Sequence, residues 1–315
     1  MSIFLSVPIW FALTGLGLAV SCLPRGLELV LGRWLGRALL HSRFFRVSVA
    51  QENIRHCLPE LSEEERRRLL VRNFEHYGLL AFEYLHMFSP LPGHFREYSR
   101  RIAFIEGAEH WDKALAEGKG VFFVSAHLGF WEMIGGFPAL SRGRPITAVT
   151  TVLEPPWLDR RINASRLSLG VKVALHPGSV PTILRALRKG ETVAFMNDQY
   201  SNPPMGMPVR FFGVRVNTLA AVAPLARRTG APIVPGWGWR EEDGRMHVRI
   251  EPAMEFSESQ LEDAEGTTTA IAARVEQWVR ARPEQWLWMH RRFKHVDWDA
   301  VGNPVPDAGS KAGMA

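Results

Sequence analysis

The most chemically suggestive stretch of the chain is VFFVSAHLGFWEMIGGF, residues 121–137, in which Glu132 follows His127 by five positions. Five residues turn a regular helix by about 500°, so two such side chains would lie about 140° apart and could not meet. A strand ending just before His127, a bend at Gly129 and a helix with Glu132 in its first turn would let both face one pocket. We therefore expect a strand, a turn and a helix here.

A histidine and a carboxylate brought together in this way can act on a hydroxyl group. The carboxylate fixes the tautomer of the imidazole and leaves its other nitrogen free to take a proton. The sequence contains neither GxSxG nor HExxH, so a serine nucleophile and a zinc hydrolase are not supported. The pair would then deprotonate a substrate alcohol for attack on an activated acyl group, with backbone donors near the turn stabilising the oxyanion. A buried, hydrogen-bonded histidine is the alternative, because the H-x4-E spacing is common.

The elements needed to position these residues are predicted by hydrophobic periodicity. From about residue 102, short apolar runs alternate with helical stretches, which is typical of an α/β domain with a central mixed, partly parallel sheet flanked by helices. Further upstream, residues 51–89 have a helical pattern, and Ser62 with Glu65 forms a capping box. The expected strands are 121–126, 145–150, 171–175, 192–196, 232–237 and 246–251, and the expected helices are 108–117, 131–141, 157–169, 180–189, 218–229 and 263–281.

Composition restricts the possible partners. The 315 residues are 46% hydrophobic and 22% charged, which describes a folded protein. Two cysteines, Cys22 and Cys57, provide no disulfide framework and no zinc motif, and we expect neither a metal nor a cofactor. The 38 Lys and Arg residues exceed the 32 Asp and Glu residues, which suits an anionic membrane surface or an acidic protein. We do not expect nucleic acid as a partner, because the sequence shows no recognised binding module.

The N-terminus is predicted to meet a membrane. Residues 3–23 carry no charge, and no basic segment precedes them as in a signal peptide, so we interpret residues 1–24 as an anchor that spans the bilayer or lies in one leaflet. Arginines follow this segment, which places the remainder on the cytoplasmic side. The next helical pattern is amphipathic and basic, typical either of a helix on an anionic leaflet or of one docked on the domain. We expect the main domain at 25–300 and a loose tail at 301–315.

Several motifs in a fixed order extend the interpretation to most of the chain. These segments are NIRHCLPELSEEERRRLLVRNFEHYG at 53–78, SAHLGFWE at 125–132, NDQY at 197–200, PVRFFGVRVNT at 208–218, LARRTGAPIVP at 225–235 and RPEQWLWMHRRFK at 282–294. With this ordered set the sequence resembles, from about residue 5 to 298, the bacterial lipid A late acyltransferase family, the lauroyl and myristoyl transferases of the lysophospholipid acyltransferase-like superfamily.

The resemblance implies a bacterial inner-membrane enzyme that moves a fatty acyl chain from acyl carrier protein, or from acyl-CoA, to a hydroxyl of a membrane glycolipid. In that family the H-x4-D/E motif is the catalytic dyad, which implies His127 as the base and Glu132 as its orienting partner. Arg166 matches a family arginine whose guanidinium would suit a lipid phosphate or carboxylate. Asp198 matches the family's Asp-Gln pair, where it would orient the site or cap a loop.

One segment departs from the family pattern. TTVLEPP, residues 150–156, stands where the family commonly has Tyr-Arg-Pro, so a charge expected near the acceptor is missing. The acceptor is accordingly a lipid A precursor or a related lipid, such as a lysophospholipid, an aminolipid or a mannosylated lipid. From a different class, a protein that binds anionic lipid without catalysis is the remaining alternative. We expect Trp286 and Trp288 in the core or at a membrane interface, and at least one of Arg291 and Arg292 in a structural role.

Overall fold

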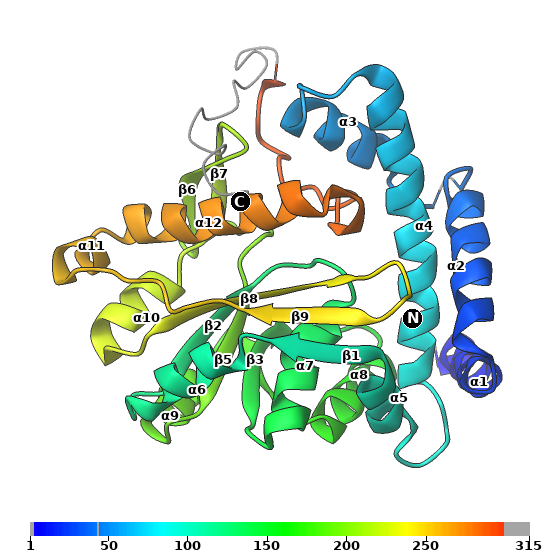
Figure 1. Ribbon diagram of the computed structural model, residues 1–315, viewed down its shortest axis with the longest axis horizontal. Coiled ribbons are helices and arrows are strands. Elements are labelled where there is room, and N and C mark those ends of the chain that lie inside the picture. Colours follow the sequence, from blue (N-terminus) through cyan, green and yellow to red (C-terminus); the bar gives the residue numbers. More distant parts are fainter. Residues whose placement is uncertain (1–2, 43, 299–315) are drawn as a thin grey trace.

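The central element of the fold is a seven-stranded sheet, seen in the computed structural model of Figure 1, which describes residues 3–42 and 44–298. Its strand order is β1-β9-β8-β2-β5-β3-β4. The bounds are Ala103–Glu106 for β1, Val121–Ser125 for β2, Ile146–Thr151 for β3, Val171–His176 for β4, Thr192–Met196 for β5, Ile233–Arg240 for β8 and Met246–Ile250 for β9.

The sheet is mixed and mostly parallel, as predicted. Neighbouring strands in the series β8-β2-β5-β3-β4 all run parallel, whereas β9 is antiparallel to β8, and β1 is parallel to β9. All six predicted strands are present. Strand β1 was missed because four residues, AFIE, are too short to show a period.

Helices cover both faces of this sheet, and the middle strand shows how. In β2, Val121 and Phe123 belong to the cluster that contains residues of α6, Ala108–Ala116, and α7, Trp131–Arg142. Phe122 and Val124 belong instead to the cluster formed with α9, Val180–Arg188, and α10, Val222–Thr229. Because successive strand side chains point to opposite faces, a strand buried on both faces is apolar at every position.

One predicted helix began too early. Residues 218 and 219 belong to β7, Val214–Leu219, which forms an antiparallel hairpin with β6, Gly206–Phe211. In β7 the buried side chains alternate, at positions 214, 216 and 218, and this period of two overrides the helical pattern until α10 begins at Val222. The other predicted helices are observed within two residues at each end, as α6, α7, α8 (Pro156–Ser168), α9 and α12 (Ala264–Ala281), and the short helices α11 (Glu258–Glu262) and η1 (Pro283–Gln285) were not predicted.

Helices of the N-terminal third pack beside the sheet rather than apart from it. Helix α2 runs along α4 in Figure 1, and their backbones approach closely at glycines. A Cβ on Gly36 would lie 2.1 Å from the Phe74 carbonyl oxygen, and one on Gly78 would lie 2.0 Å from that of Gly32. The bounds are α1 Ile3–Ser21, α2 Arg25–Leu39, α3 Val47–Cys57, α4 Glu63–Met87 and α5 His94–Ile102. The predicted capping box of Ser62 and Glu65 opens α4.

Buried ion pairs lie beneath this helix pair. Arg25 Nη2 of α2 donates to Glu83 Oε1 of α4 at 2.7 Å, and Arg25 Nη1 donates to Glu28 at 2.9 Å. Arg240, at the end of β8, donates to both oxygens of Glu83. We call Arg25, Glu28, Glu83 and Arg240 the interhelix cluster. It shows that α2 is docked on the domain, one of the two arrangements considered for this segment.

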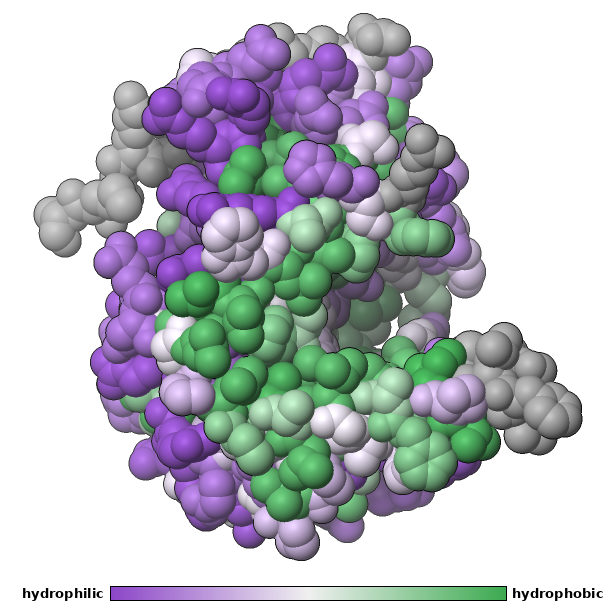
Figure 2. Space-filling view, turned by 90° about the vertical axis from the view of Figure 1, so that its right-hand side faces the viewer, coloured by the Kyte–Doolittle hydropathy of each residue, from purple (hydrophilic) through white to green (hydrophobic). Residues whose placement is uncertain are grey.

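Helices α1 and α2 expose many apolar side chains, although α2 also exposes Arg33 and Arg37. Figure 2 shows apolar side chains gathered over much of the face on which these helices lie. The large apolar side chains that α1 and α2 expose include Val7, Phe11, Leu16, Leu18, Leu27, Val30 and Trp34. Within the described part of the chain, no helix is long and apolar enough to cross a bilayer. The predicted tail at 301–315 lies outside the described residues.

Candidate active site

His127 lies where the sequence predicted it, just beyond a strand. Strand β2 ends at Ser125, and α7 begins at Trp131, so Glu132 falls in the first helical turn. Gly129 makes the bend with a φ of 58°, a conformation that favours glycine. A Cβ at this position would also lie 2.9 Å from the carbonyl oxygen of Gly238, so the turn requires glycine on both grounds.

The carboxylate that binds this histidine belongs to Asp198. His127 Nδ1 lies 2.8 Å from Asp198 Oδ1, and the backbone N–H of His127 donates to Asp198 Oδ2, also at 2.8 Å. The Trp286 indole donates to the same Oδ2 at 2.9 Å. Asp198 follows β5, the parallel neighbour of β2, and the carboxyl ends of parallel strands meet at one edge of a sheet, where site residues collect.

These contacts determine the charge of both groups. Burial would raise the pKa of Asp198, but the charge of His127 and the hydrogen bonds from His127 and Trp286 outweigh it and lower the pKa to about 2. For His127, burial would lower the pKa, yet the charge of Asp198 and the hydrogen bond to it raise the pKa above its usual 6.5. Asp198 therefore stays ionised, holds the proton on Nδ1, and leaves Nε2 as the basic nitrogen. Among the described residues, nothing forms a hydrogen bond with Nε2.

Glu132 has a different partner from the one expected. Both its oxygens accept hydrogen bonds from Arg166, with Nη2 at 2.8 Å from Oε1 and Nε at 2.9 Å from Oε2. The Tyr84 hydroxyl donates to Oε1 at 3.2 Å. Burial lowers and Glu132 raises the pKa of Arg166, with a net increase, so the arginine keeps its charge. The expected hydrogen bond from His127 to Glu132 is absent, and both oxygens of Glu132 accept from the planar guanidinium of Arg166 instead.

These side chains face one apolar cavity. It measures about 580 Å³ and is lined by His127, Glu132 and Arg166 at its polar part. The sheet and the adjoining helices supply most of the remaining wall, including Phe123, Ile134, Ile146, Val149, Phe195 and Leu219. An apolar space whose wall includes a basic nitrogen can hold a hydrocarbon chain with its reactive end at the imidazole.

The segment that departs from the family pattern also borders this cavity. Thr150, Thr151 and Leu153 line it. The backbone N–H of Leu153 donates to Asp159, whose carboxylate accepts from Asn163, and Asn163 in turn accepts from Arg166. A chain of hydrogen bonds therefore joins residues 150–156 to the Glu132 and Arg166 pair.

Two groups near the site were not assigned to it from the sequence. Trp286 was expected in the core or at a membrane interface, and its indole also binds Asp198. Arg292, expected to be structural unless it met an anion, is fully buried and donates to Gln199 O, Asn217 O and Thr218 Oγ1. The motif 282–294 marks this segment in the sequence, but only the fold places Trp286 beside Asp198, which lies 88 positions upstream. In the residues described, no three His, Cys, Asp or Glu side chains are grouped to hold a metal ion.

A half-buried histidine held by a buried aspartate thus lies at the carboxyl edge of the parallel strands, beside an apolar cavity. The family described as bacterial lipid A biosynthesis acyltransferase matches residues 3–295, and the chain belongs to this family. It is therefore an acyltransferase, and the expected resemblance is confirmed.

Individual relatives share much of the chain. This chain is 31% identical over 292 residues to the lipid A biosynthesis lauroyltransferase of Escherichia coli (strain K12), and the aligned region covers 90% of this chain and 92% of the relative. To the lipid A biosynthesis palmitoleoyltransferase of the same strain it is 28% identical, with 90% of each chain covered. To the phosphatidylinositol mannoside acyltransferase of Mycobacterium tuberculosis (strain CDC 1551 / Oshkosh) it is 30% identical, over 69% of this chain and 68% of the relative.

Proposed function

We propose that this protein is a membrane-associated O-acyltransferase that moves a fatty acyl chain from an acyl thioester to a hydroxyl of a lipid A precursor. The observation that carries the proposal is the His127 imidazole, which is held by Asp198 on Nδ1 and lines an apolar cavity of about 580 Å³. The cavity suits the acyl chain, and the imidazole suits the hydroxyl that attacks it.

In the proposed reaction, Nε2 of His127 takes the proton of the acceptor hydroxyl while the hydroxyl oxygen bonds to the thioester carbonyl carbon. The tetrahedral intermediate then breaks its carbon–sulfur bond, and the leaving thiolate takes the proton back from the imidazolium. Asp198 remains ionised throughout and stabilises the imidazolium. The products are an ester and a free thiol, and His127 returns to its neutral form.

Glu132 and Arg166 would bind rather than transfer protons. Their guanidinium–carboxylate pair lines the cavity beside His127, and the Arg166 side chain is 16% exposed. We assign Arg166 to an anionic or hydroxyl group of the substrate and Glu132 to holding Arg166 in place. Asp198, expected to bind substrate, is assigned instead to orienting the base.

The acceptor would reach this site from a membrane. Leu13 of α1 packs against the buried cluster that contains Phe130, and Trp131 and Leu153, which pack against the same cluster, line the cavity. Helix α1 and the cavity wall therefore share one apolar cluster, and we propose that the apolar outer face of α1 and α2 lies in one leaflet (Figure 2). The arginines that follow α1 would place the domain on the cytoplasmic face of the bacterial inner membrane, against anionic lipid and within reach of acyl carrier protein or acyl-CoA.

A mannosylated lipid is the second candidate acceptor. It is favoured by the similarity to the phosphatidylinositol mannoside acyltransferase and by TTVLEPP at the cavity wall. Lysophospholipid and aminolipid acceptors would use the same chemistry and have no specific observation in their favour.

The decisive experiment combines purified protein, a lauroyl thioester of acyl carrier protein and a panel of these lipids, followed by mass analysis of the products. We expect an acylated lipid A precursor with wild-type protein and none with His127→Ala. Transfer only to the mannosylated lipid would change the acceptor. Equal transfer by wild type and His127→Ala would refute the catalytic assignment and favour a protein that only binds lipid.

A further inference from the structure

The C-terminal segment 286–292 holds the catalytic carboxylate from behind. Asp198 is 1% exposed, and one oxygen faces His127 Nδ1. Its other oxygen accepts from the backbone N–H of His127 at 2.8 Å and from the Trp286 indole at 2.9 Å. Among the described residues, Trp286 is the one side chain besides His127 that donates to Asp198. A carboxylate free to rotate would lose its alignment with the imidazole, and the indole adds a donor from outside the His127 turn that helps to fix the plane of the carboxylate.

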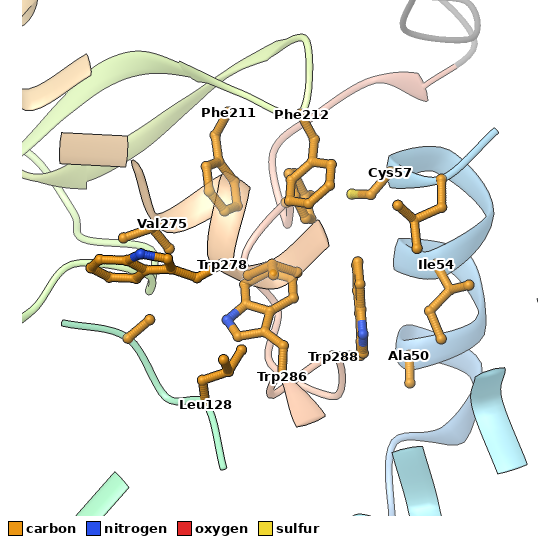
Figure 3. Packing of buried hydrophobic residues seen from close by; sticks show 14 of the residues in the cluster. Ala50, Ile54, Cys57, Leu128, Phe211, Phe212, Val275, Trp278, Trp286 and Trp288 are labelled. Atoms are coloured by element: carbon orange, nitrogen blue, oxygen red, sulfur yellow. The ribbon is translucent and has the colours of Figure 1, made fainter. Parts of the chain in front are cut away.

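Trp286 is itself held rigidly. Its backbone forms a bridge with Leu128, the residue after the catalytic histidine, and its carbonyl oxygen accepts from Asn73 at 2.8 Å and Tyr77 at 3.1 Å. Figure 3 shows the ring lodged among the other aromatic side chains of this core, next to Trp288 and Leu128. The indole N–H therefore has little freedom to follow a displaced carboxylate.

Arg292 binds the backbone of the loop that carries Asp198. It is fully buried and donates to the carbonyl oxygen of Gln199, the residue after Asp198, at 3.2 Å. Its nearest hydrogen-bond acceptors are carbonyl and hydroxyl oxygens, and burial lowers its pKa to about 10. Burying an arginine beside neutral acceptors costs folding free energy. We infer that these hydrogen bonds serve to hold the loop in one position.

We propose that Trp286 is a positioning residue for the acyl transfer, acting through Asp198 on the orientation and basicity of His127. This inference rests on the proposed function of His127 as the base. The indole N–H forms a hydrogen bond with the negative carboxylate of Asp198, and the carboxylate therefore stabilises the imidazolium of His127 less strongly. Without the indole N–H, the pKa of His127 would rise, and the imidazole would be held less well.

Trp286→Phe removes the indole N–H and keeps an aromatic ring. With lauroyl acyl carrier protein and a lipid A precursor, we expect kcat per folded protein to fall by about tenfold to hundredfold, the range for a hydrogen bond to a charged group, with KM little changed. The acidic limb of the pH profile of kcat/KM should also move to higher pH.

Trp288→Phe is the matched control. Trp288 is equally buried in the same segment, but its indole donates to the Pro283 carbonyl oxygen and not to Asp198. A structural role for Trp286 would lower the midpoint of thermal unfolding and leave the acidic limb in place. If both variants give the same pH profile as wild type, the proposal is overturned.

A measurement on the Asp198→Asn variant covers the case in which Trp286→Phe fails to fold. Loss of the charged acceptor should move the indole proton resonance of Trp286 upfield and leave that of Trp288 unchanged, and an unmoved Trp286 resonance would overturn the proposal. Absence of acyl transfer by the wild-type protein would instead refute the proposed function. The two failures can be told apart because the indole measurement does not depend on activity.

Discussion

Two groups of largely buried charges contact neighbouring positions of helix α4 and are built differently. The interhelix cluster of Arg25, Glu28, Glu83 and Arg240 joins α2, α4 and β8. The second group, which we call the cavity cluster, consists of His127, Asp198, Glu132 and Arg166. Tyr84 of α4 contacts the cavity cluster, and Glu83, the preceding residue, belongs to the interhelix cluster.

The difference lies in what each cluster leaves unpaired. Glu83 is fully buried, and both its oxygens are occupied by arginines, so its charge serves to hold elements together. In the cavity cluster, the His127 side chain is 18% exposed and lines a cavity, with one nitrogen bonded and the other open. A carboxylate paired through both oxygens contributes to stability, whereas a histidine with an open nitrogen beside a cavity can exchange a proton with a ligand.

Asp198→Asn should produce the largest effect. A neutral amide can donate to Nδ1 and so favour the wrong tautomer, which places the proton on Nε2 and removes the base. We expect kcat to fall by about 10⁴-fold, the size known for this tautomer effect in a serine protease, with a much smaller change in stability. Acyl transfer and thermal unfolding measured side by side will test this. Activity within tenfold of wild type would show that Asp198 is not the partner of the base.

Glu83→Gln should affect stability rather than chemistry. It leaves the buried Arg240 and the partly buried Arg25 without a full countercharge, and breaking a buried pair typically costs about 3–5 kcal/mol. Chemical denaturation should show this loss, and kcat of the folded fraction should change little. The contribution also depends on pH. Burial raises and Arg240 and Arg25 lower the pKa of Glu83, with a net decrease, so its stabilisation is present above about pH 4.5 and is lost as the pH falls through the lowered pKa.

Glu132→Gln should have a smaller effect on catalysis than Asp198→Asn. It weakens the hold on Arg166 and leaves the His127 and Asp198 pair intact, so we expect kcat/KM to fall by about tenfold to hundredfold. The double variant with Arg166→Met should be less impaired than the two single effects combined, because both changes break one interaction. A loss larger than that of Asp198→Asn would restore Glu132 as the direct partner of the base.

The pH profile should show the smallest effect and separate the two carboxylates. The pKa of His127 is raised above 6.5, so kcat/KM should increase as the pH rises through this raised pKa and the base becomes neutral. Glu132→Gln should shift this limb slightly to lower pH, because Glu132 contributes less than Asp198 to the increase. A shift in the opposite direction would contradict this assignment of charges.

Local patterns accounted for much of the fold. The capping box of α4, the six predicted strands and the bend at Gly129 all depend on residues close together in the chain, where period and turn chemistry are decisive. Strand β1 was missed because four residues show no period and its pairing partner β9 is distant in sequence. The start of α10 was missed because β7 pairs with β6 in a hairpin that was not predicted.

The candidate site divides in the same way. The sequence by itself determined that His127 follows a strand and that Glu132 opens a helix, and family motifs pointed to Arg166 and Asp198. Only the tertiary structure decided the pairing, with Asp198 on His127 and Arg166 on Glu132. The physical reason is the parallel order of β2 and β5, which brings two strand ends 71 positions apart in sequence to one edge of the sheet, while the turn of α7 directs Glu132 toward α8.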